Sequence, residues 1–272
     1  MNVVKTIPTY LGKHIRCFYS LYAPVTEKLY SPHRRLPDGT LDLVFNLGPA
    51  PILISRNGDE FSAMPDVVLT GLHPDRSFLC YQEKVHLVGV VFKPGSAHLF
   101  VRDSLEHFKS CTAEASLVFG NMNDVLEQLK ATSGEREKHL LLEHFLLENF
   151  SGLSTKHYSP EISAAVEQIH SLDGNILMSE LYKEYFMSER NFRRKFNEYV
   201  GMSPKHYATI IKIKSFSKRY ELERAAHAPI LDELGYTDQS HFNKDFQKIV
   251  GTTVSAYFDQ LNQIGEEFIH LI

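Results

Sequence analysis

Apolar and polar residues alternate in the N-terminal part of the chain, which predicts β-strands there. Residues 36–47 (LPDGTLDLVFNL) begin with turn-forming residues and then place an apolar side chain at every second position. This alternation at Leu41, Leu43 and Phe45 is typical of a strand that buries one face. A further strand is predicted at residues 86–92 (HLVGVVF), which Lys93, Pro94 and Gly95 follow.

Asn57 and Gly58 lie between two apolar runs, which predicts a β-hairpin with these two residues at its tip. A type I′ turn needs positive φ at both central positions, and Asn-Gly is well suited to it. Several short strands with turn residues between them predict an antiparallel β domain over about the first 100 residues, either a small barrel or a sandwich.

From about residue 96 the apolar spacing becomes helical. Helices are predicted at residues 123–131 and 135–150, and the second carries too much apolar surface for an exposed helix. This helix either docks on the β domain of its own chain or forms a dimer interface.

The polar segment 151–160 contains Gly and Pro and separates two halves of different composition, so we expect a linker there. The chain would then consist of a β-rich sensing or dimerisation domain at 1–150 with helices at its end, and an all-α domain at 161–262. With 272 residues, the chain is long enough for two hydrophobic cores. The expected fold class is α+β.

The C-terminal half contains an internal repeat with an offset of 50 residues. Its first copy has Phe192, Phe196, Val200, Gly201, Ser203 and Tyr207, which recur as Phe242, Phe246, Val250, Gly251, Thr253 and Tyr257. Upstream of these positions the offset is 49, so the second copy has one additional residue in its turn. Each copy is predicted to be a short helix, a turn that ends at a capping residue (Ser188 or Asp238) and a longer helix. This arrangement is a helix-turn-helix.

The longer helix of each copy has an apolar face and a polar face. At about 100° per residue, the aromatic residues of the first copy fall on one side. The polar residues on the opposite side are Arg190, Arg193, Arg194 and Asn197 in the first copy, and Ser240, Asn243, Lys244 and Gln247 in the second. Arg, Lys, Asn and Gln are the side chains that match base edges and phosphates.

A third helix is predicted between the two copies. Ser203 can cap it and Pro204 can be its first residue, since proline is tolerated there. With about 20 residues it would span about 30 Å, close to the ~34 Å between successive major-groove faces of DNA. One chain could therefore place two helices in adjacent grooves.

Charge is distributed unevenly along the chain, whose net charge is -4. Residues 190–219 contain nine basic residues and one acid, Glu198, whereas residues 220–260 contain three basic and seven acidic residues. A positive segment in an acidic protein is a candidate phosphate-facing surface. We therefore expect phosphate attraction to come mainly from the first copy.

Signals for an enzyme or a membrane protein are absent from the sequence. It contains no HxH pair, GxSxG, P-loop or GxGxxG, and the SxxK at residues 215–218 has no partner motif. The three cysteines are widely spaced and indicate plain thiols, and no stretch approaches ~18 apolar residues. We expect no catalytic residue, metal or cofactor, and a cytoplasmic protein. A cupin-like metal enzyme stays as the weakest alternative.

The two helix-turn-helix units resemble those of the AraC/XylS family of bacterial transcriptional regulators. LGYTDQSHFNKDFQKIVG (residues 234–251) is similar to the second helix-turn-helix of that family, and MSERNFRRKFNEYVGMSPKHY (residues 187–207) to the first. LPDGTLDLVFNLG and VGVVFKPG resemble an N-terminal domain of uncharacterised role that precedes such DNA-binding domains. The sequence departs from the family at five positions: Tyr182 and Leu231 replace small residues, Lys212 and Phe216 replace Arg and Ala, and Val254 replaces a proline.

The resemblance implies a sequence-specific, DNA-binding regulator of transcription. By position, the residues that enter the major groove would be Arg190, Arg193 and Arg194 in the first copy and Gln239, Ser240, Asn243 and Lys244 in the second. The expected partners are double-stranded DNA, a small-molecule effector in the N-terminal domain, a second copy of the chain and, if the protein is an activator, RNA polymerase. The alternative is an interaction protein of similar fold that has lost DNA binding.

Overall fold

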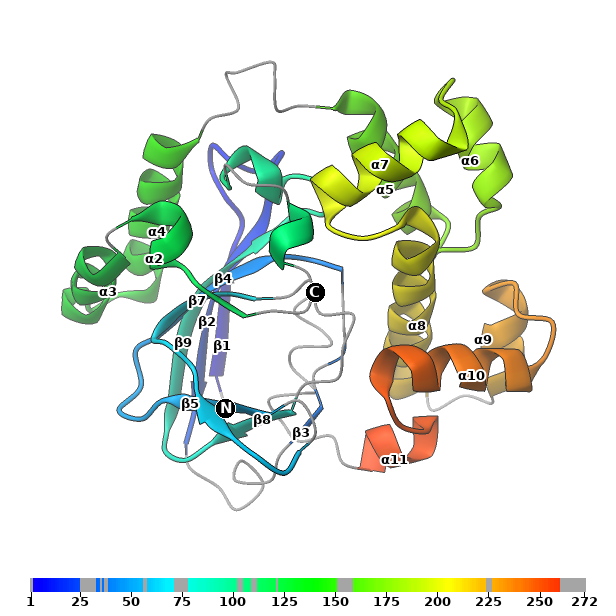
Figure 1. The fold of residues 1–272 in the computed structure, drawn as a ribbon. Helices are drawn as coiled ribbons and strands as arrows, with labels where there is room; N and C mark the ends of the chain where they lie inside the picture. The colour runs from blue at the N-terminus through cyan, green and yellow to red at the C-terminus, as the bar shows by residue number, and fades with distance from the viewer. Residues whose placement is uncertain are drawn as a thin grey trace.

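A computed structural model describes residues 2–24, 33–34, 36, 39–55, 58–70, 78–101, 105–108, 112–120, 122–150, 159–223 and 227–259. A β-rich N-terminal half and a helical C-terminal half lie side by side (Figure 1). This α+β architecture confirms the expected fold class. Most of the predicted linker, residues 151–158, lies outside the described residues.

The N-terminal half contains two antiparallel sheets. A six-stranded sheet has the order β1-β2-β9-β4-β7-β10, and a four-stranded sheet has the order β3-β8-β5-β6. The strands are β1 (Asn2–Thr6), β2 (Ile15–Ala23), β3 (His33–Arg34), β4 (Asp42–Asn46), β5 (Ile52–Ser55), β6 (Ser62–Ala63), β7 (Val67–Thr70), β8 (Phe78–Tyr81), β9 (Val85–Phe92) and β10 (Ala113–Glu114). The sequence predicts only helices between residue 96 and the linker, but strand β10 at Ala113–Glu114 lies in this region.

The predicted alternation in β4 is present, but the prediction of a half-buried strand is wrong. Leu43 and Phe45 are fully buried in the core that faces the helices, as predicted. Val44 on the opposite face is also buried, against residues of the four-stranded sheet such as Ile52 and Tyr81. Strand β4 lies between β9 and β7, and both faces of its sheet are covered.

The predicted hairpin is formed by β5 and β6, which pair in antiparallel fashion. The connection from Ser55 to Ser62 is longer than a two-residue turn, so the predicted two-residue geometry is wrong. Gly58 has a φ of +90°, as its place near the tip requires, whereas Asn57 lies outside the described residues.

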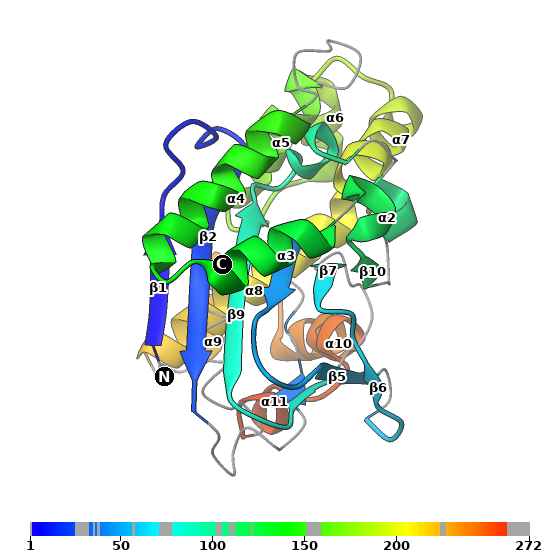
Figure 2. The same cartoon turned by 90° about the vertical axis from the view of Figure 1, so that its left-hand side faces the viewer.

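Short helices and two longer ones follow the strands: η1 (Ala97–Leu99), η2 (Leu105–Phe108), α2 (Ser116–Phe119), α3 (Met122–Ala131) and α4 (Glu135–Asn149). The predicted helices at 123–131 and 135–150 are therefore confirmed to within one residue. Helices α3 and α4 lie across one face of the six-stranded sheet (Figure 2). Leu142 and Leu146 of α4 are fully buried there, which confirms docking on the β domain of the same chain.

Polar contacts also fix α4 to the sheet. The His139 ring lies between the hydroxyls of Thr6 and Ser20, at 2.7 and 2.9 Å, and the Glu143 carboxylate accepts hydrogen bonds from the backbone N–H groups of Tyr10 and Leu11. Buried polar groups need such partners. The long helix therefore holds the turn between β1 and β2 in place.

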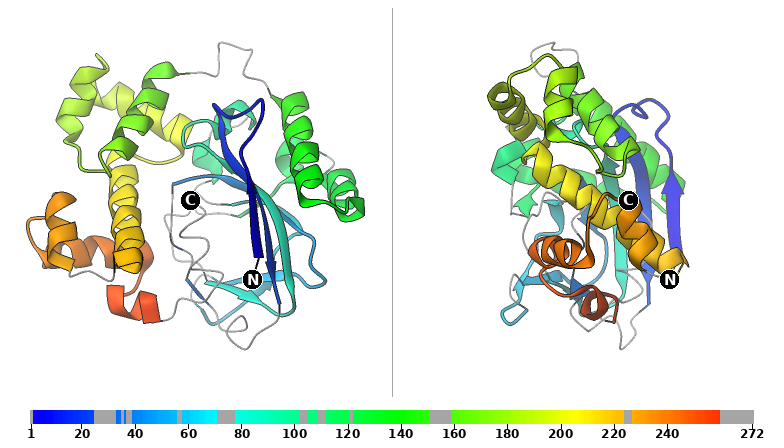
Figure 3. Two further views of the ribbon diagram at one scale, coloured as in Figure 1. Left: turned by 180° about the vertical axis from the view of Figure 1, so that it is seen from behind. Right: turned by 90° about the vertical axis from the view of Figure 1, so that its right-hand side faces the viewer.

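The described residues of the C-terminal half from Pro160 onward form only helices and their connections. These are α5 (Pro160–Ser171), α6 (Met178–Glu184), α7 (Glu189–Val200), α8 (Pro204–Glu223), α9 (His227–Glu233), α10 (Gln239–Val250) and α11 (Val254–Asp259). Helix α8 runs unbroken for 20 residues, with α6 and α7 at one end and α9 and α10 at the other (Figures 1 and 3). The predicted pair of helix-turn-helix units joined by one helix is thus confirmed.

One hydrophobic core continues from the N-terminal half into the first helix-turn-helix. Helix α7 packs against η1 and η2, which belong to the N-terminal half. The buried cluster contains Leu99 and Leu105 together with Phe196. The N-terminal half therefore contacts one predicted DNA-reading helix directly.

Candidate nucleic-acid interface

Helix α7 begins at a side-chain cap and buries its aromatic face. The Ser188 hydroxyl accepts a hydrogen bond from the backbone N–H of Asn191, as predicted for a capping residue. Phe192 and Phe196 are fully buried. The opposite side exposes Arg190, Arg193 and Arg194, whereas Asn197 is half-buried. The helix ends at Gly201, whose φ of +84° is the usual left-handed end of a helix.

Helix α10 repeats this arrangement. The Asp238 carboxylate accepts a hydrogen bond of 2.8 Å from the backbone N–H of His241, and this bond holds the pKa of Asp238 below its ordinary value. Phe242 and Phe246 are fully buried. The predicted contact residues Gln239, Ser240, Asn243 and Lys244 are all exposed. The structure therefore places seven of the eight predicted residues at the surface, on two helices of the same kind.

The turns of the two units differ as the sequence predicts. Four residues separate α6 from α7, and five separate α9 from α10. The left-handed residue after the first helix is Phe186 in one turn and Gly235 in the other. Met187 and Tyr236 follow these residues, and the caps are Ser188 and Asp238. The additional residue of the second turn is therefore Thr237.

The bulky residues at the helix crossings are accommodated by aromatic packing. The Tyr182 ring lies 5.3 Å from that of Phe192, and the Phe216 ring lies 4.3 Å from that of Phe242. The Lys212 ammonium lies 5.0 Å from the centre of the Tyr236 ring, and burial lowers the pKa of this lysine. These three departures from the family pattern are thus compatible with both helix-turn-helix units.

Two of the exposed arginines are paired with acids of their own helix. Arg193 lies 3.5 Å from Glu189 and Arg194 lies 3.2 Å from Glu198. Both pairs are four residues apart and solvent-exposed, and such pairs contribute only about 0.3–0.5 kcal/mol. A DNA phosphate could therefore replace either carboxylate as the partner of the arginine at a small cost in free energy.

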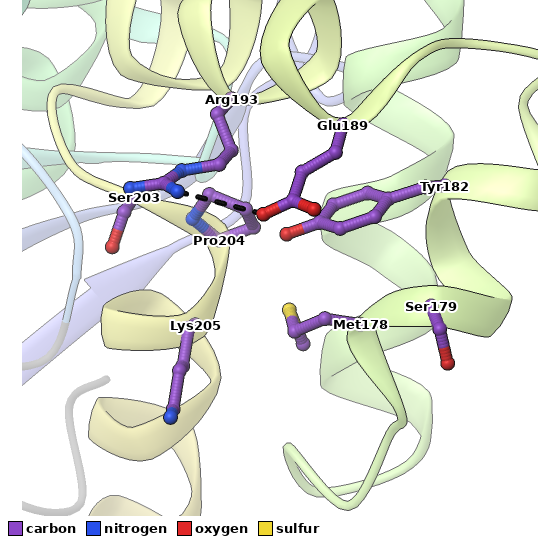
Figure 4. A pocket seen from close by; sticks show the side chains of 8 residues that line it. All are labelled: Met178, Ser179, Tyr182, Glu189, Arg193, Ser203, Pro204 and Lys205. Atoms are coloured by element: carbon purple, nitrogen blue, oxygen red, sulfur yellow. Dashed lines mark hydrogen bonds and ion pairs between the residues drawn. The ribbon is translucent and has the colours of Figure 1, made fainter.

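A pocket of about 350 Å³ lies beside Arg193, between α6, α7 and the start of α8. Figure 4 shows the Arg193–Glu189 pair above it, Tyr182 and Met178 from α6, and Lys205 from α8. Lys205 belongs to the positive segment but was not predicted from the sequence as a contact residue. Its place near Arg193 follows from the turn between α7 and α8, which residue spacing alone does not determine.

The C-terminal end of α7 is covered by the N-terminal half. The buried His98 ring of η1 contacts the Tyr199 ring edge-on, with 4.7 Å between the centroids. The exposed arginines lie nearer the opposite end of the helix. In a helix-turn-helix the N-terminal residues of the second helix are those that contact base edges. The arginines in the half of α7 that such contacts require are exposed.

Neither a metal-binding cluster nor a membrane-spanning helix is present in the part of the chain that the structure describes. No group of three or more His, Cys, Asp or Glu residues there is arranged to hold a metal ion. None of its helices combines the length and the apolar character of a membrane span.

Comparison with known protein families agrees with this geometry. The family model of a helix-turn-helix domain matches residues 181–260. The C-terminal half contains an AraC-type helix-turn-helix domain. A second model, a domain of unknown function called DUF6597, matches residues 8–114. The resemblance inferred from the sequence is thus confirmed for the AraC-type domain and for the N-terminal domain of uncharacterised role. No curated protein matches the chain.

Several crystal structures of ToxT from Vibrio cholerae are also similar to this chain. A ligand-free point variant of ToxT is 14% identical, with a TM-score of 0.48 over 90% of this chain and 98% of that one. A structure of ToxT with a bound unsaturated fatty acid is 16% identical, with a TM-score of 0.45 over 90% of this chain and 94% of that one.

Proposed function

We propose that this protein regulates transcription by binding specific DNA sequences, with α7 and α10 in adjacent major grooves. The observation that carries the proposal is the repeated pair of capped helices, each with a buried aromatic face and an exposed polar face. They lie at opposite ends of α8, whose 20 residues span about 30 Å. This length is close to the ~34 Å between successive major-groove faces.

The exposed residues divide into two kinds of contact. Arg190, Arg193 and Arg194 would bind phosphates and guanine edges, because a guanidinium is always charged and can donate two parallel hydrogen bonds. Lys205 would add phosphate attraction at the pocket beside Arg193. In α10, the amides of Gln239 and Asn243 suit adenine. The other expected contacts are Asn197, Ser240 and Lys244.

The N-terminal half would control this activity. We propose that it holds a small-molecule effector or joins two copies of the chain, since its η1 and η2 pack on α7. As an activator, the protein would also contact RNA polymerase. It would act in the bacterial cytoplasm, where DNA is accessible.

The second candidate function is an interaction protein that has lost DNA binding. The paired state of Arg193 and Arg194 and the acidic surroundings of α10 favour it. The three arginines on the exposed side of α7 favour DNA binding instead, because an interaction surface does not require such a cationic stripe.

A gel-shift experiment distinguishes the two functions. The full chain is mixed with labelled DNA from upstream of its own gene, with and without excess unlabelled nonspecific DNA. We expect a shifted band that survives the competitor. A band that nonspecific DNA abolishes, or no band at low salt, would support the interaction protein.

A further inference from the structure

A cavity of about 530 Å³ lies between the two halves of the molecule. The turn between β1 and β2 and the turn after β9 form one wall, and α5 forms the other. A ligand in this cavity would contact both halves at once, and none of the lining residues belongs to α7 or α10. Its volume is within the ~300–1,000 Å³ of small-molecule sites.

The walls of the cavity are strongly cationic. Lys13, Arg16 and Lys93 line it together with one carboxylate, that of Glu167. Neither Lys13 nor Lys93 has a carboxylate partner within the described part of the chain. Permanent charges that converge on a concave site attract a ligand of opposite charge. The cavity is therefore suited to an anion.

Two histidines in the same walls have pKa values that burial, and to a smaller extent nearby cations, lower. Burial, Lys13 and Lys93 hold the pKa of His14 below its ordinary value. Burial, Lys214 and Arg16 lower the pKa of His170 to about 3. Both rings are consequently neutral near pH 7, and the permanent positive charge of the cavity comes from Lys and Arg.

We propose that this cavity binds a compact polyanion, of the class of phosphorylated or polycarboxylic metabolites. Apart from Val166 and Pro94, the side chains that line it are polar or charged. A long hydrocarbon chain with a single carboxylate would leave one of the two lysines, Lys13 or Lys93, without a counter-charge. A small ligand with two or more negative charges neutralises both lysines.

The cavity is connected to α7 through two side-chain contacts. His170 shares a hydrogen bond of 2.6 Å between its Nε2 and the hydroxyl of Tyr207, in the first turn of α8. The Tyr207 ring contacts Phe196 of α7, with 5.7 Å between the centroids. A polyanion that binds one arrangement of the two halves more tightly would therefore change the position of α7. This coupling rests on the proposed DNA-binding function, whereas the binding site does not.

Calorimetric titration of the DNA-free full chain tests the site, with citrate and inorganic phosphate as probes. We expect one site per chain and a Kd of about 1 mM or tighter for at least one of the two probes. Replacing both Lys13→Ala and Lys93→Ala should weaken binding at least about tenfold. These side chains are exposed and half-exposed, so the variant should fold.

Lys84→Ala provides the matched control, because Lys84 and Lys93 flank opposite ends of β9, about 30 Å apart. It should bind as the native chain does. The site would be overturned if neither probe binds at 10 mM, which is about tenfold above the expected Kd. It would also be overturned if the Lys13→Ala, Lys93→Ala variant binds the probes as tightly as the native chain. Oleate binding that depends on the same lysines would overturn the ligand class.

DNA titrations with and without the bound probe then test the coupling. We expect a change of at least about threefold in DNA affinity for the native chain and none for the double variant. Weaker DNA binding by the double variant without any probe would show that these lysines contact DNA, and would overturn the proposal. If no DNA is bound at all, the proposed function fails while the calorimetric result still decides the site.

Discussion

Phe186 and Gly235 occupy the same position in the two helix-turn-helix turns, and both have a left-handed backbone, with φ values of +50° and +73°. Glycine adopts this conformation readily, whereas an aromatic residue is strained in it. The Phe186 side chain is 98% exposed, so packing does not offset the strain.

Replacing Phe186→Gly should therefore stabilise the protein. We expect the free energy of unfolding to rise by about 1 kcal/mol, measured by urea denaturation. Asp173→Gly is the control, because Asp173 has a φ of +49° but a side chain that tolerates this conformation. A gain no larger than that of the control would show that the turn is not strained at Phe186.

Gly39→Ala should destabilise the contact between the two halves. A Cβ at residue 39 would lie 2.5 Å from a ring carbon of Tyr207. The Tyr207 ring is fully buried, and its hydroxyl shares a hydrogen bond with His170. We expect a loss of at least about 2 kcal/mol in the free energy of unfolding. Gly120→Ala has a similar φ, +78°, with no atom within 4 Å of the added Cβ, and should lose only the cost of backbone strain. Equal losses would contradict a rigid contact at Tyr207.

The half-buried His170 should make stability depend on pH. The pKa of His170 is about 3 in the folded chain, against about 6.5 in an unfolded one. The unfolded chain therefore takes up the proton first as the pH falls, so stability is full above about pH 7 and is lost between about pH 6.5 and pH 3. Between pH 7 and pH 5 the native chain should lose up to roughly 2 kcal/mol more than His170→Gln. Urea denaturation at both pH values measures this difference. Equal losses of unfolding free energy in the native chain and in His170→Gln would contradict the prediction.

Sequence periodicity predicted the helices that bury one face and one of the two buried faces of β4. The helical spacing of Phe192 and Phe196 was sufficient to place both in the core. Periodicity could not reveal that Val44 is also buried, because a second covered face depends on which strands pair and on what lies above them. The shorter strands, such as β10, depend on a partner that is distant in sequence.

The candidate interface was predictable to a similar extent. Exposure of the polar residues on α7 and α10 followed from the repeat. The ion pair between Arg193 and Glu189 could also have been anticipated, since the two residues are four apart. The cavity at Lys13, Lys93 and His170 could not, because only the packing of the two halves brings these residues together.

The two reading helices should contribute unequally to DNA binding, because the positive charge is concentrated in the first unit. We expect Arg193→Ala or Arg194→Ala to weaken specific binding by at least about 1 kcal/mol, and Asn243→Ala or Lys244→Ala to cost less. Titrations at two salt concentrations separate the contacts, since each lost phosphate contact lowers the slope of log affinity against log salt by ~0.9. A larger loss from the α10 variants would contradict this division.

Selection from a random pool of double-stranded DNA is the sharpest test of sequence-specific binding by α7 and α10, because it needs no known target. The full chain is incubated with the pool at moderate salt, and the retained sequences are read after several rounds. We expect two conserved blocks with centres about 10 base pairs apart, one for α7 and one for α10. A retained pool as random as the starting one would contradict sequence-specific binding, and a single conserved block would contradict reading by both helices.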